Sequence, residues 1–200
     1  MVIVFLGPPG VGKGTQCRLL AASSGLPHVS TGELFRKAVA QASDISQHVA
    51  ARLSAGQLVD DRLVFDVVEW RLGQSDCRKG CILDGFPRNL SQAEWLDQWL
   101  AQRGRNVDLV IALNAAESEL VDRLLRRASQ EHRSDDTLET VRTRLALYRS
   151  HTEPLVDYYR RRGVLVEVDG LGTPEEVARR IRQAMDQRIG GTGPGDNREG

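Results

Sequence analysis

The stretch GPPGVGKGTQ, residues 7–16, follows the apolar run MVIVFL and leads into a helical pattern over residues 15–22. A strand, a glycine-rich turn and a helix in this order form the setting of a phosphate-binding loop. The glycines let successive backbone N–H groups point at one anion, and the helix N-terminus adds partial positive charge. Lys13 supplies a full charge for β- and γ-phosphates, and Thr15 supplies a hydroxyl for Mg²⁺. The stretch therefore predicts a site for nucleotide phosphates.

The hydroxyl is displaced by one position from the strict motif, in which Ser or Thr follows the lysine directly. Here Gly14 intervenes and Thr15 comes next. The alternative is a plain glycine-rich turn between a strand and a helix. Because such a turn requires neither the second pair of glycines nor the lysine, we prefer the phosphate site.

Composition narrows the classes of partner. The chain has 27 basic and 27 acidic residues among 200, so its formal net charge is zero. A neutral chain has no global field that attracts nucleic acid or an anionic membrane. Basic and aromatic residues are not interleaved as nucleic-acid binding would require. We expect neither nucleic acid nor a membrane as a partner.

The cysteines indicate a reducing compartment. Their number is odd, and Cys17, Cys77 and Cys81 lack the spacing of a four-ligand metal site, so we expect free thiols, with Cys17 and Cys81 in the core. Cys77 and Cys81 as half of a metal site is the weaker alternative. No run approaches transmembrane length, and the apolar N-terminus is too short for a signal peptide. We therefore expect a cytoplasmic protein.

Apolar strands alternate with helical patterns along the chain. Strands are predicted over residues 1–6, 80–84, 108–113 and 164–168, and a turn followed by a short strand within 25–30. Helices are predicted over 15–22, from 31 through 36, and over 43–53, 60–72, 91–102, 117–127, 138–162 and 173–188. This alternation predicts an α/β fold with a parallel sheet and right-handed crossovers. Ligands bind such sheets at the carboxyl ends of the strands. Residues 189–200 are polar and glycine-rich and predict a disordered tail.

Asp84 and six arginines are candidates for phosphate chemistry. Asp84 ends a predicted strand, where an acid beside a phosphate-binding loop directs Mg²⁺, although it could instead cap a helix or form a turn. The ordinary interpretation of such arginines is that they are solvated surface residues. Phosphoryl transfer between two nucleotides, however, concentrates negative charge that guanidinium groups can neutralise. The arginines with this potential are Arg36, Arg88, Arg123, Arg127, Arg133 and Arg144.

Two segments lie between core elements and can close over such a site, residues 30–59 and 128–136. Closure matters because a donor phosphate that is open to solvent is lost to water. The four histidines show no paired spacing, and we interpret them as surface or structural residues.

Several motifs together resemble the adenylate kinase family. GPPGVGKGTQ, STGELFR, AGQLV, DGFPRNLSQ and the arginine run RLLRR occur in the family's order and spacing over residues 1–188. The resemblance implies a P-loop three-layer fold, with a five-stranded parallel sheet, helices on both faces, an NMP-binding insert at 30–59 and a short lid at about 128–136. It implies reversible, Mg²⁺-dependent transfer from ATP to AMP that gives two ADP, and a monomer.

The resemblance also assigns roles by matching position. ATP would contact Gly10, Val11, Gly12, Lys13, Gly14, Thr15, Arg123, Arg127 and, through the backbone at adenine, Gly172. AMP would contact Thr31, Arg36, Gln57, Leu58, Val59, Gly85, Phe86, Pro87, Arg88, Gln92, Arg133 and Arg144. Catalysis would rest on Lys13, Arg88, Arg127, Arg133 and Arg144, and Mg²⁺ on Thr15 and Asp84, directly or through water. The Phe86–Pro87 peptide is often cis in the family.

The sequence departs from the family pattern at the lid and at two side chains. The lid has no cysteines, so a structural zinc ion is not expected. Glu33 stands where Asp is common, and Asp60 where Thr or Pro is common, but neither position carries chemistry.

Two alternatives stay open. A UMP/CMP kinase shares DGFPRN and the short lid, but Thr31 and Gln92 favour AMP, because a Gln amide can pair with the N6 donor and N1 acceptor of adenine. A non-catalytic nucleotide-binding regulator could dispense with Lys13, Asp84 or Arg88, and all three are present.

Overall fold

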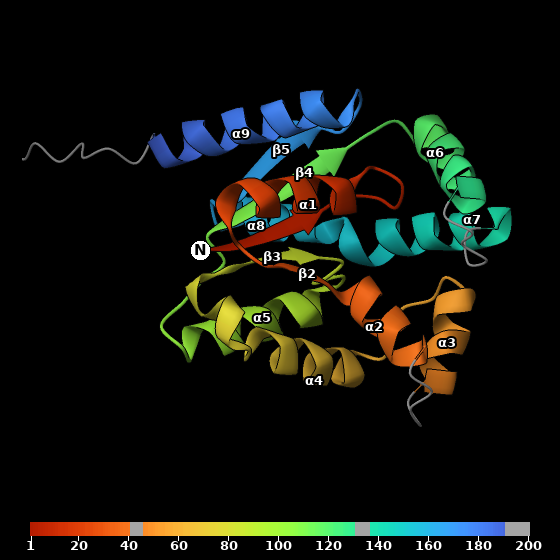
Figure 1. Ribbon diagram of the computed structural model, residues 1–200, viewed down its shortest axis with the longest axis horizontal. Coiled ribbons are helices and arrows are strands. Elements are labelled where there is room, and N and C mark those ends of the chain that lie inside the picture. The colour runs from red at the N-terminus through yellow and green to blue at the C-terminus, as the bar shows by residue number, and fades with distance from the viewer. Residues whose placement is uncertain (41–45, 131–136, 191–200) are drawn as a thin grey trace, which may run out of the picture.

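A computed structural model describes residues 1–40, 46–130 and 137–190 of the chain. Within them, five strands form one parallel sheet in the order β2-β3-β1-β4-β5 (Figure 1). The strands are β1 (Val2–Leu6), β2 (His28–Ser30), β3 (Cys81–Asp84), β4 (Leu109–Asn114) and β5 (Leu165–Asp169). The predicted α/β fold with a five-stranded parallel sheet is confirmed.

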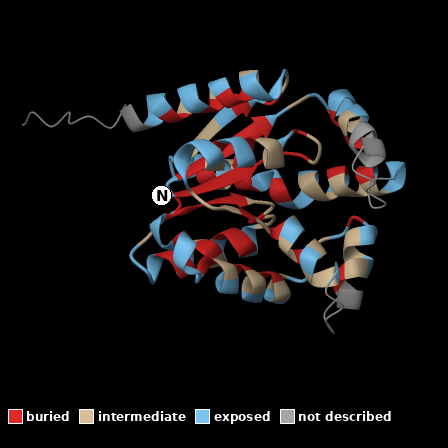
Figure 2. Cartoon of the chain, viewed as in Figure 1, coloured by how far each residue is buried: buried red, intermediate tan, exposed pale blue. Residues whose placement is uncertain are grey.

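The central strands are apolar except for the last residues of β3 and β4, because both faces of the sheet are covered. All five residues of β1 are buried, and Val4 pairs with Leu83 of β3 and Val110 of β4. Figure 2 shows the buried strands at the centre of the molecule, with exposed residues on the outer faces of the helices.

The two faces of the sheet carry separate apolar cores. Val2, Val4 and Leu6 pack toward the helices α4 (Asp61–Leu72), α5 (Leu90–Ala101) and α8 (Pro154–Arg161). Ile3 and Phe5 point the other way, toward α1 (Lys13–Ser24) and α9 (Pro174–Gly190). This alternation follows from the period of two in a strand, and it produces the three layers.

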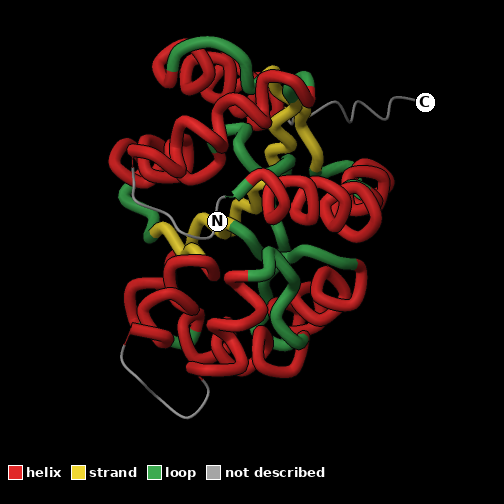
Figure 3. Tube along the Cα trace, turned by 90° about the vertical axis from the view of Figure 1, so that its right-hand side faces the viewer, coloured by secondary structure: helices red, strands yellow, loops and turns green. Residues whose placement is uncertain are grey.

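The remaining helices lie beyond the carboxyl ends of the strands. They are α2 (Thr31–Ala40), α3 (Ser46–Ser54), α6 (Glu117–Gln130) and α7 (Leu138–Leu147) (Figure 1). In Figure 3, which views the molecule from that side, helical segments surround the ends of the strands. These helices therefore stand around the edge where a ligand of a parallel sheet is expected.

The predicted single helix over residues 138–162 is wrong in detail. It consists of α7, a π-helical turn (Tyr148–Thr152) and α8. Pro154 explains the interruption, because it has no N–H to donate and its ring excludes a regular helix before it. The Glu153 N–H instead bonds the Tyr148 carbonyl, five residues back, at 2.9 Å. The extra residue of this turn changes the direction of the side chains that precede α8.

Other differences concern ends and caps. A 3₁₀ turn (Ser75–Lys79) was not predicted, and α9 runs to Gly190, two residues into the predicted tail. Asp60 precedes α4, but its side chain makes no capping hydrogen bond and contacts Arg52 instead. The predicted residues 43–45 and most of the predicted tail, 191–200, lie outside the described residues. None of the described helices is both long and apolar enough to cross a bilayer.

Candidate active site

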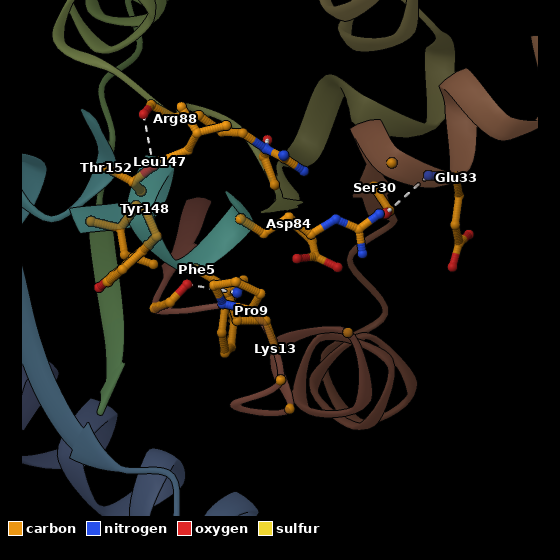
Figure 4. Close-up of a pocket in the computed structure, with 18 of the residues that line it drawn as sticks. Phe5, Pro9, Lys13, Ser30, Glu33, Asp84, Arg88, Leu147, Tyr148 and Thr152 are labelled. Atoms are coloured by element: carbon orange, nitrogen blue, oxygen red, sulfur yellow. Dashed lines mark hydrogen bonds between the residues drawn. The ribbon is translucent and has the colours of Figure 1, made fainter. Parts of the chain in front are cut away.

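A cavity of about 400 Å³ opens at the carboxyl ends of β1 and β3. Its wall combines the glycine-rich loop after β1, the turn after β3, and residues of α2, α6, α7 and the π turn. Figure 4 shows Lys13 from the start of α1, Asp84 from the end of β3 and Arg88 from the turn after β3 around this space. The cavity is large enough for a small-molecule ligand, and it lies at the expected edge of the sheet.

The loop between β1 and α1 forms the floor of the cavity. Gly12 precedes α1 in a left-handed conformation, with φ +100°, and Gly10 has φ +86°. A Cβ on Gly10 would lie 2.9 Å from the Leu120 carbonyl oxygen, so only glycine permits this approach to α6. The Lys13 ammonium donates to the carbonyls of Gly7 at 2.7 Å and Pro8 at 2.9 Å. Lys13, Gly14 and Thr15 all line the cavity, which places the lysine and the N-terminus of α1 beside it.

Asp84 ends β3 beside this loop. Its Oδ2 lies 3.3 Å from Nε2 of His28 in the neighbouring strand β2. Burial raises the pKa of Asp84, but the hydrogen bond from His28 and the positive charges of Lys13 and Arg88 outweigh burial and hold that pKa below its usual value. The side chain is thus a carboxylate at neutral pH, and the hydroxyl of Thr15 lines the same cavity. Hard oxygen ligands of this kind fit Mg²⁺.

Arg88 is fixed along its backbone and its side chain. Its N–H donates to Oε1 of Gln92 at 2.7 Å, and its carbonyl accepts from the Thr152 hydroxyl at 2.7 Å (Figure 4). Its Nε donates to the Gly85 carbonyl at 2.7 Å. Gly85 has φ +78°, and a Cβ there would lie 3.0 Å from the guanidinium of Arg88. The guanidinium is therefore held in place before any ligand arrives.

Three guanidinium groups influence one another in the cavity. Burial, together with the positive charges of Arg144 and Arg36, lowers the pKa of Arg88, although Asp84 opposes the shift. Arg36 comes from α2 and Arg144 from α7, and both line the same cavity. A cluster of like charges favours a bound anion such as phosphate.

A second, smaller pocket of about 30 Å³ adjoins the first, with Arg88, Gly85, Gln57 and Leu58 shared by both. Gln92 lines it and is only 2% exposed. The Gln92 Nε2 donates to Asp61 at 2.7 Å, so both ends of its amide have protein partners. The Thr31 hydroxyl, also in this wall, donates to the Gly85 carbonyl at 2.9 Å.

The structure brings most of the predicted site residues together. The main cavity is lined by Gly10, Gly12, Lys13, Gly14, Thr15, Arg36, Gln57, Leu58, Asp84, Gly85, Pro87, Arg88, Arg123 and Arg144. The smaller pocket adds Thr31, Val59 and Gln92. Val11 and Phe86 are buried beneath these surfaces, and the Phe86–Pro87 bond is cis, as expected.

Three predicted residues are not placed at the cavity. Gly172 is exposed in the loop between β5 and α9 and does not line either pocket. Arg127 belongs to α6, but its side chain lies outside the described part of the chain, as does Arg133 altogether. The roles assigned to these residues stay predictions.

Sequence reasoning missed three supporting residues. His28 meets Asp84 only because β2 pairs with β3, and Thr152 meets Arg88 only because of the π turn. Asp61, in the first turn of α4, accepts hydrogen bonds from Gln92 and Asn89. No local pattern in the sequence predicts these contacts, because the two partners of each contact lie far apart along the chain.

The adenylate kinase family model matches residues 5–164. The chain belongs to the adenylate kinase family. It is 45% identical to the adenylate kinase of Thermobifida fusca over 188 residues, which is 94% of this chain and all of that protein. It is 48% identical to an adenylate kinase of Thermus thermophilus over 183 residues, covering 92% of this chain and 96% of the relative. The Clavibacter michiganensis adenylate kinase is 46% identical over 92% of each chain.

Membership in the adenylate kinase family confirms the expected class of enzyme, a nucleoside monophosphate kinase that transfers phosphate from ATP to AMP. The relatives match nearly the whole chain, so the match includes both the glycine-rich loop and the arginine cluster. The pyrimidine kinase and the non-catalytic regulator are not favoured.

Proposed function

We propose that the main cavity is the place where the γ-phosphoryl group of ATP passes to AMP, giving two ADP. The proposal is based on one observation: two groups of residues suited to bind anions line opposite sides of the same cavity. The glycine-rich loop with Lys13 forms one side, and Arg36, Arg88 and Arg144 form the other. Such an arrangement can hold two phosphate chains end to end.

ATP is proposed to bind at the loop. The N–H groups of the loop and of the first turn of α1 would surround its phosphates, and Lys13 would leave the carbonyls of Gly7 and Pro8 for the β- and γ-phosphates. Arg123 approaches from α6, where its guanidinium donates to the Gly170 carbonyl at 3.1 Å. Arg127 and Gly172 are proposed to complete the donor site, and Arg133 is proposed to contact the transferring phosphate and AMP.

Thr15 and Asp84 are proposed to hold Mg²⁺, directly or through water. The ionised carboxylate and the hydroxyl in one wall support this proposal. When bound, Mg²⁺ neutralises charge on the triphosphate and orients it. His28 keeps the Asp84 carboxylate in position through the contact at 3.3 Å.

AMP is proposed to place its phosphate at Arg36, Arg88 and Arg144 and its base near Thr31 and Gln92. Guanidinium groups fixed before binding need no rearrangement as charge moves between the phosphates. Gln57, Leu58, Val59 and the turn over residues 85–87 would complete the wall around the nucleotide. The smaller pocket, at about 30 Å³, holds little more than a water molecule, so the base enters when this wall opens.

That opening is proposed to involve residues 30–59 as an NMP-binding insert, with residues 128–136 as a lid. Support comes from α2 and α3, which stand beyond the sheet (Figure 1). A monomer, a cytoplasmic location and the lack of nucleic-acid and membrane partners stay predictions.

A panel of acceptors tests the function. ATP and Mg²⁺ are supplied with AMP, CMP or UMP, and ADP formation is followed in a coupled assay. We expect AMP to be preferred by a wide margin in kcat/KM, because the Gln92 amide matches adenine. Equal turnover of CMP or UMP would contradict the assignment.

A further inference from the structure

Three side chains with metal-binding atoms meet beneath the glycine-rich loop. They are Cys17 of α1, His28 of β2 and Asp84 of β3, and their ligand atoms all lie within 4.8 Å of one another. Cys17 is buried, whereas the side chains of His28 and Asp84 are 12% and 14% exposed. Asp84 also lines the main cavity, so the cluster has a route to solvent.

The spacing is close to that of a tetrahedral metal site. With metal–nitrogen and metal–oxygen bonds of about 2.0–2.1 Å, the two ligand atoms are separated by roughly 3.3 Å. Nε2 of His28 and Oδ2 of Asp84 are already 3.3 Å apart. A zinc–sulfur bond of about 2.3 Å requires the sulfur to lie roughly 3.6 Å from each of these atoms. Because all three ligand atoms lie within 4.8 Å of one another, the Cys17 sulfur needs to approach by at most about 1.2 Å, which a rotation of its side chain can supply.

The donor set selects for a particular class of cation. A thiolate, an imidazole and a carboxylate suit zinc and related divalent ions, and they do not suit Mg²⁺, which prefers oxygen alone. A thiol that coordinates such a cation gives up its proton and binds as the thiolate.

We propose that Cys17, His28 and Asp84 form a zinc-class metal site, with the fourth position open toward the nucleotide cavity. Binding releases the thiol proton of Cys17, and the remaining proton of the His28 ring moves to Nδ1. The ammonium of Lys13 lies close enough to act on both Cys17 and Asp84, and its positive charge repels a bound cation, so the site binds metal more weakly than a structural zinc site.

Occupation of this site inhibits the enzyme. This consequence rests on the proposed role of Asp84 as a ligand of Mg²⁺, because a carboxylate that binds zinc is no longer available to bind magnesium. The existence of the metal site does not depend on that role, and the two are tested separately.

Cobalt tests the site directly. Metal-free, full-length protein is titrated with Co²⁺ under reducing conditions, and absorption is recorded for the thiolate-to-cobalt charge transfer and the visible bands of tetrahedral Co²⁺. We expect both in the wild type, with their loss on addition of Zn²⁺. Cys17→Ala abolishes the charge-transfer band, and His28→Gln weakens binding by at least tenfold. The matched controls Cys77→Ala, at another buried cysteine, and His151→Gln, at an exposed histidine, retain it.

Lack of the band in the wild type, its full retention in Cys17→Ala, or its loss in Cys77→Ala would overturn the proposal. Circular dichroism confirms that each variant is folded. If Cys17→Ala fails to fold, His28→Gln decides, because its side chain is partly exposed and its replacement leaves the core cysteine intact.

Inhibition is measured separately, with Zn²⁺ added at constant Mg²⁺ and ATP, and each rate is divided by the same variant's rate without zinc. We expect Cys17→Ala to require at least tenfold more zinc for half-inhibition than the wild type. A wild type that binds Co²⁺ through Cys17 but keeps its full rate would support the metal site and contradict the proposed role of Asp84.

Discussion

Arg88 illustrates what a single residue needs beyond its own side chain. Its N–H, carbonyl and Nε all have partners, from Gln92, Thr152 and Gly85 respectively. The motif DGFPR predicted the arginine, because its turn follows the carboxyl end of a strand. The Thr152 contact was not predictable, because it depends on where the π turn places a residue 64 positions away.

Thr152→Val tests the hydroxyl with little change in shape. Valine leaves the Arg88 carbonyl without this donor, at a cost of about 0.5–1.5 kcal/mol for the lost hydrogen bond, and lets the turn shift. We expect kcat to fall about tenfold, corresponding to roughly 1.4 kcal/mol, with a smaller change in KM for AMP. Steady-state kinetics measure both.

Thr152→Ser provides the rescue, since it restores the hydroxyl and removes only a methyl group. If kcat of Thr152→Ser were as low as that of Thr152→Val, or if Thr152→Val lowered the melting temperature without changing kcat, Thr152 would be a packing residue and not a positioning residue for Arg88.

At the scale of elements, α4 and α5 meet through polar side chains at their first turns. Asp61 accepts from Gln92 at 2.7 Å and from Asn89 at 3.0 and 3.1 Å, and Asn89 caps α5 by accepting from the Gln92 N–H at 2.8 Å. The helices themselves were predictable from periodicity and from their cap residues. Their contact was not, because pairing of two helices is decided by tertiary packing.

Asp61→Asn tests whether α4 orients the proposed base-recognising amide. The neutral side chain has one carbonyl oxygen for partners that now share two carboxylate oxygens, and hydrogen bonds to a charged acceptor are stronger. We expect the KM for AMP to rise several-fold while the KM for ATP stays constant. Asp66→Asn, on an exposed position of the same helix, is the control. Equal changes for both nucleotides would contradict this role.

Glu167 of β5 gives a prediction about pH. Its hydrogen bond with Arg160 of α8 lowers its pKa, against the opposing effect of burial, and Asn114 of β4 contributes further. Because the folded-state pKa lies below the unfolded value, the contribution is present above the unfolded pKa, about 4.3, and is lost as pH falls through the folded value.

Glu167→Gln should therefore lower the free energy of unfolding at pH 7 by less than about 1 kcal/mol, because both side chains are about half exposed. The difference from the wild type should shrink as the pH falls below about 4. Urea unfolding at several pH values measures it. A difference that is constant with pH would show that packing, and not charge, is responsible.

At the scale of the whole molecule, the fold brings residues from each third of the chain to one edge of the sheet. Lys13, Asp84 and Arg144 belong to different elements and line one cavity. The sequence could predict this convergence, because parallel strands place their carboxyl ends together. It could not predict that Lys13 rests on its own loop, or that Cys17 and His28 gather at Asp84, since both depend on side-chain packing.

The rate of Arg88→Ala tests most directly whether this cavity is the place of phosphoryl transfer. Its guanidinium is held before substrate binds, so its contribution should be greatest when charge moves in the transition state. We predict that kcat falls by about 10²–10³-fold with ATP and AMP, with the melting temperature nearly constant. Arg179→Ala, at an exposed arginine of α9, should keep the wild-type rate. A folded Arg88→Ala enzyme with near-normal kcat would contradict the account.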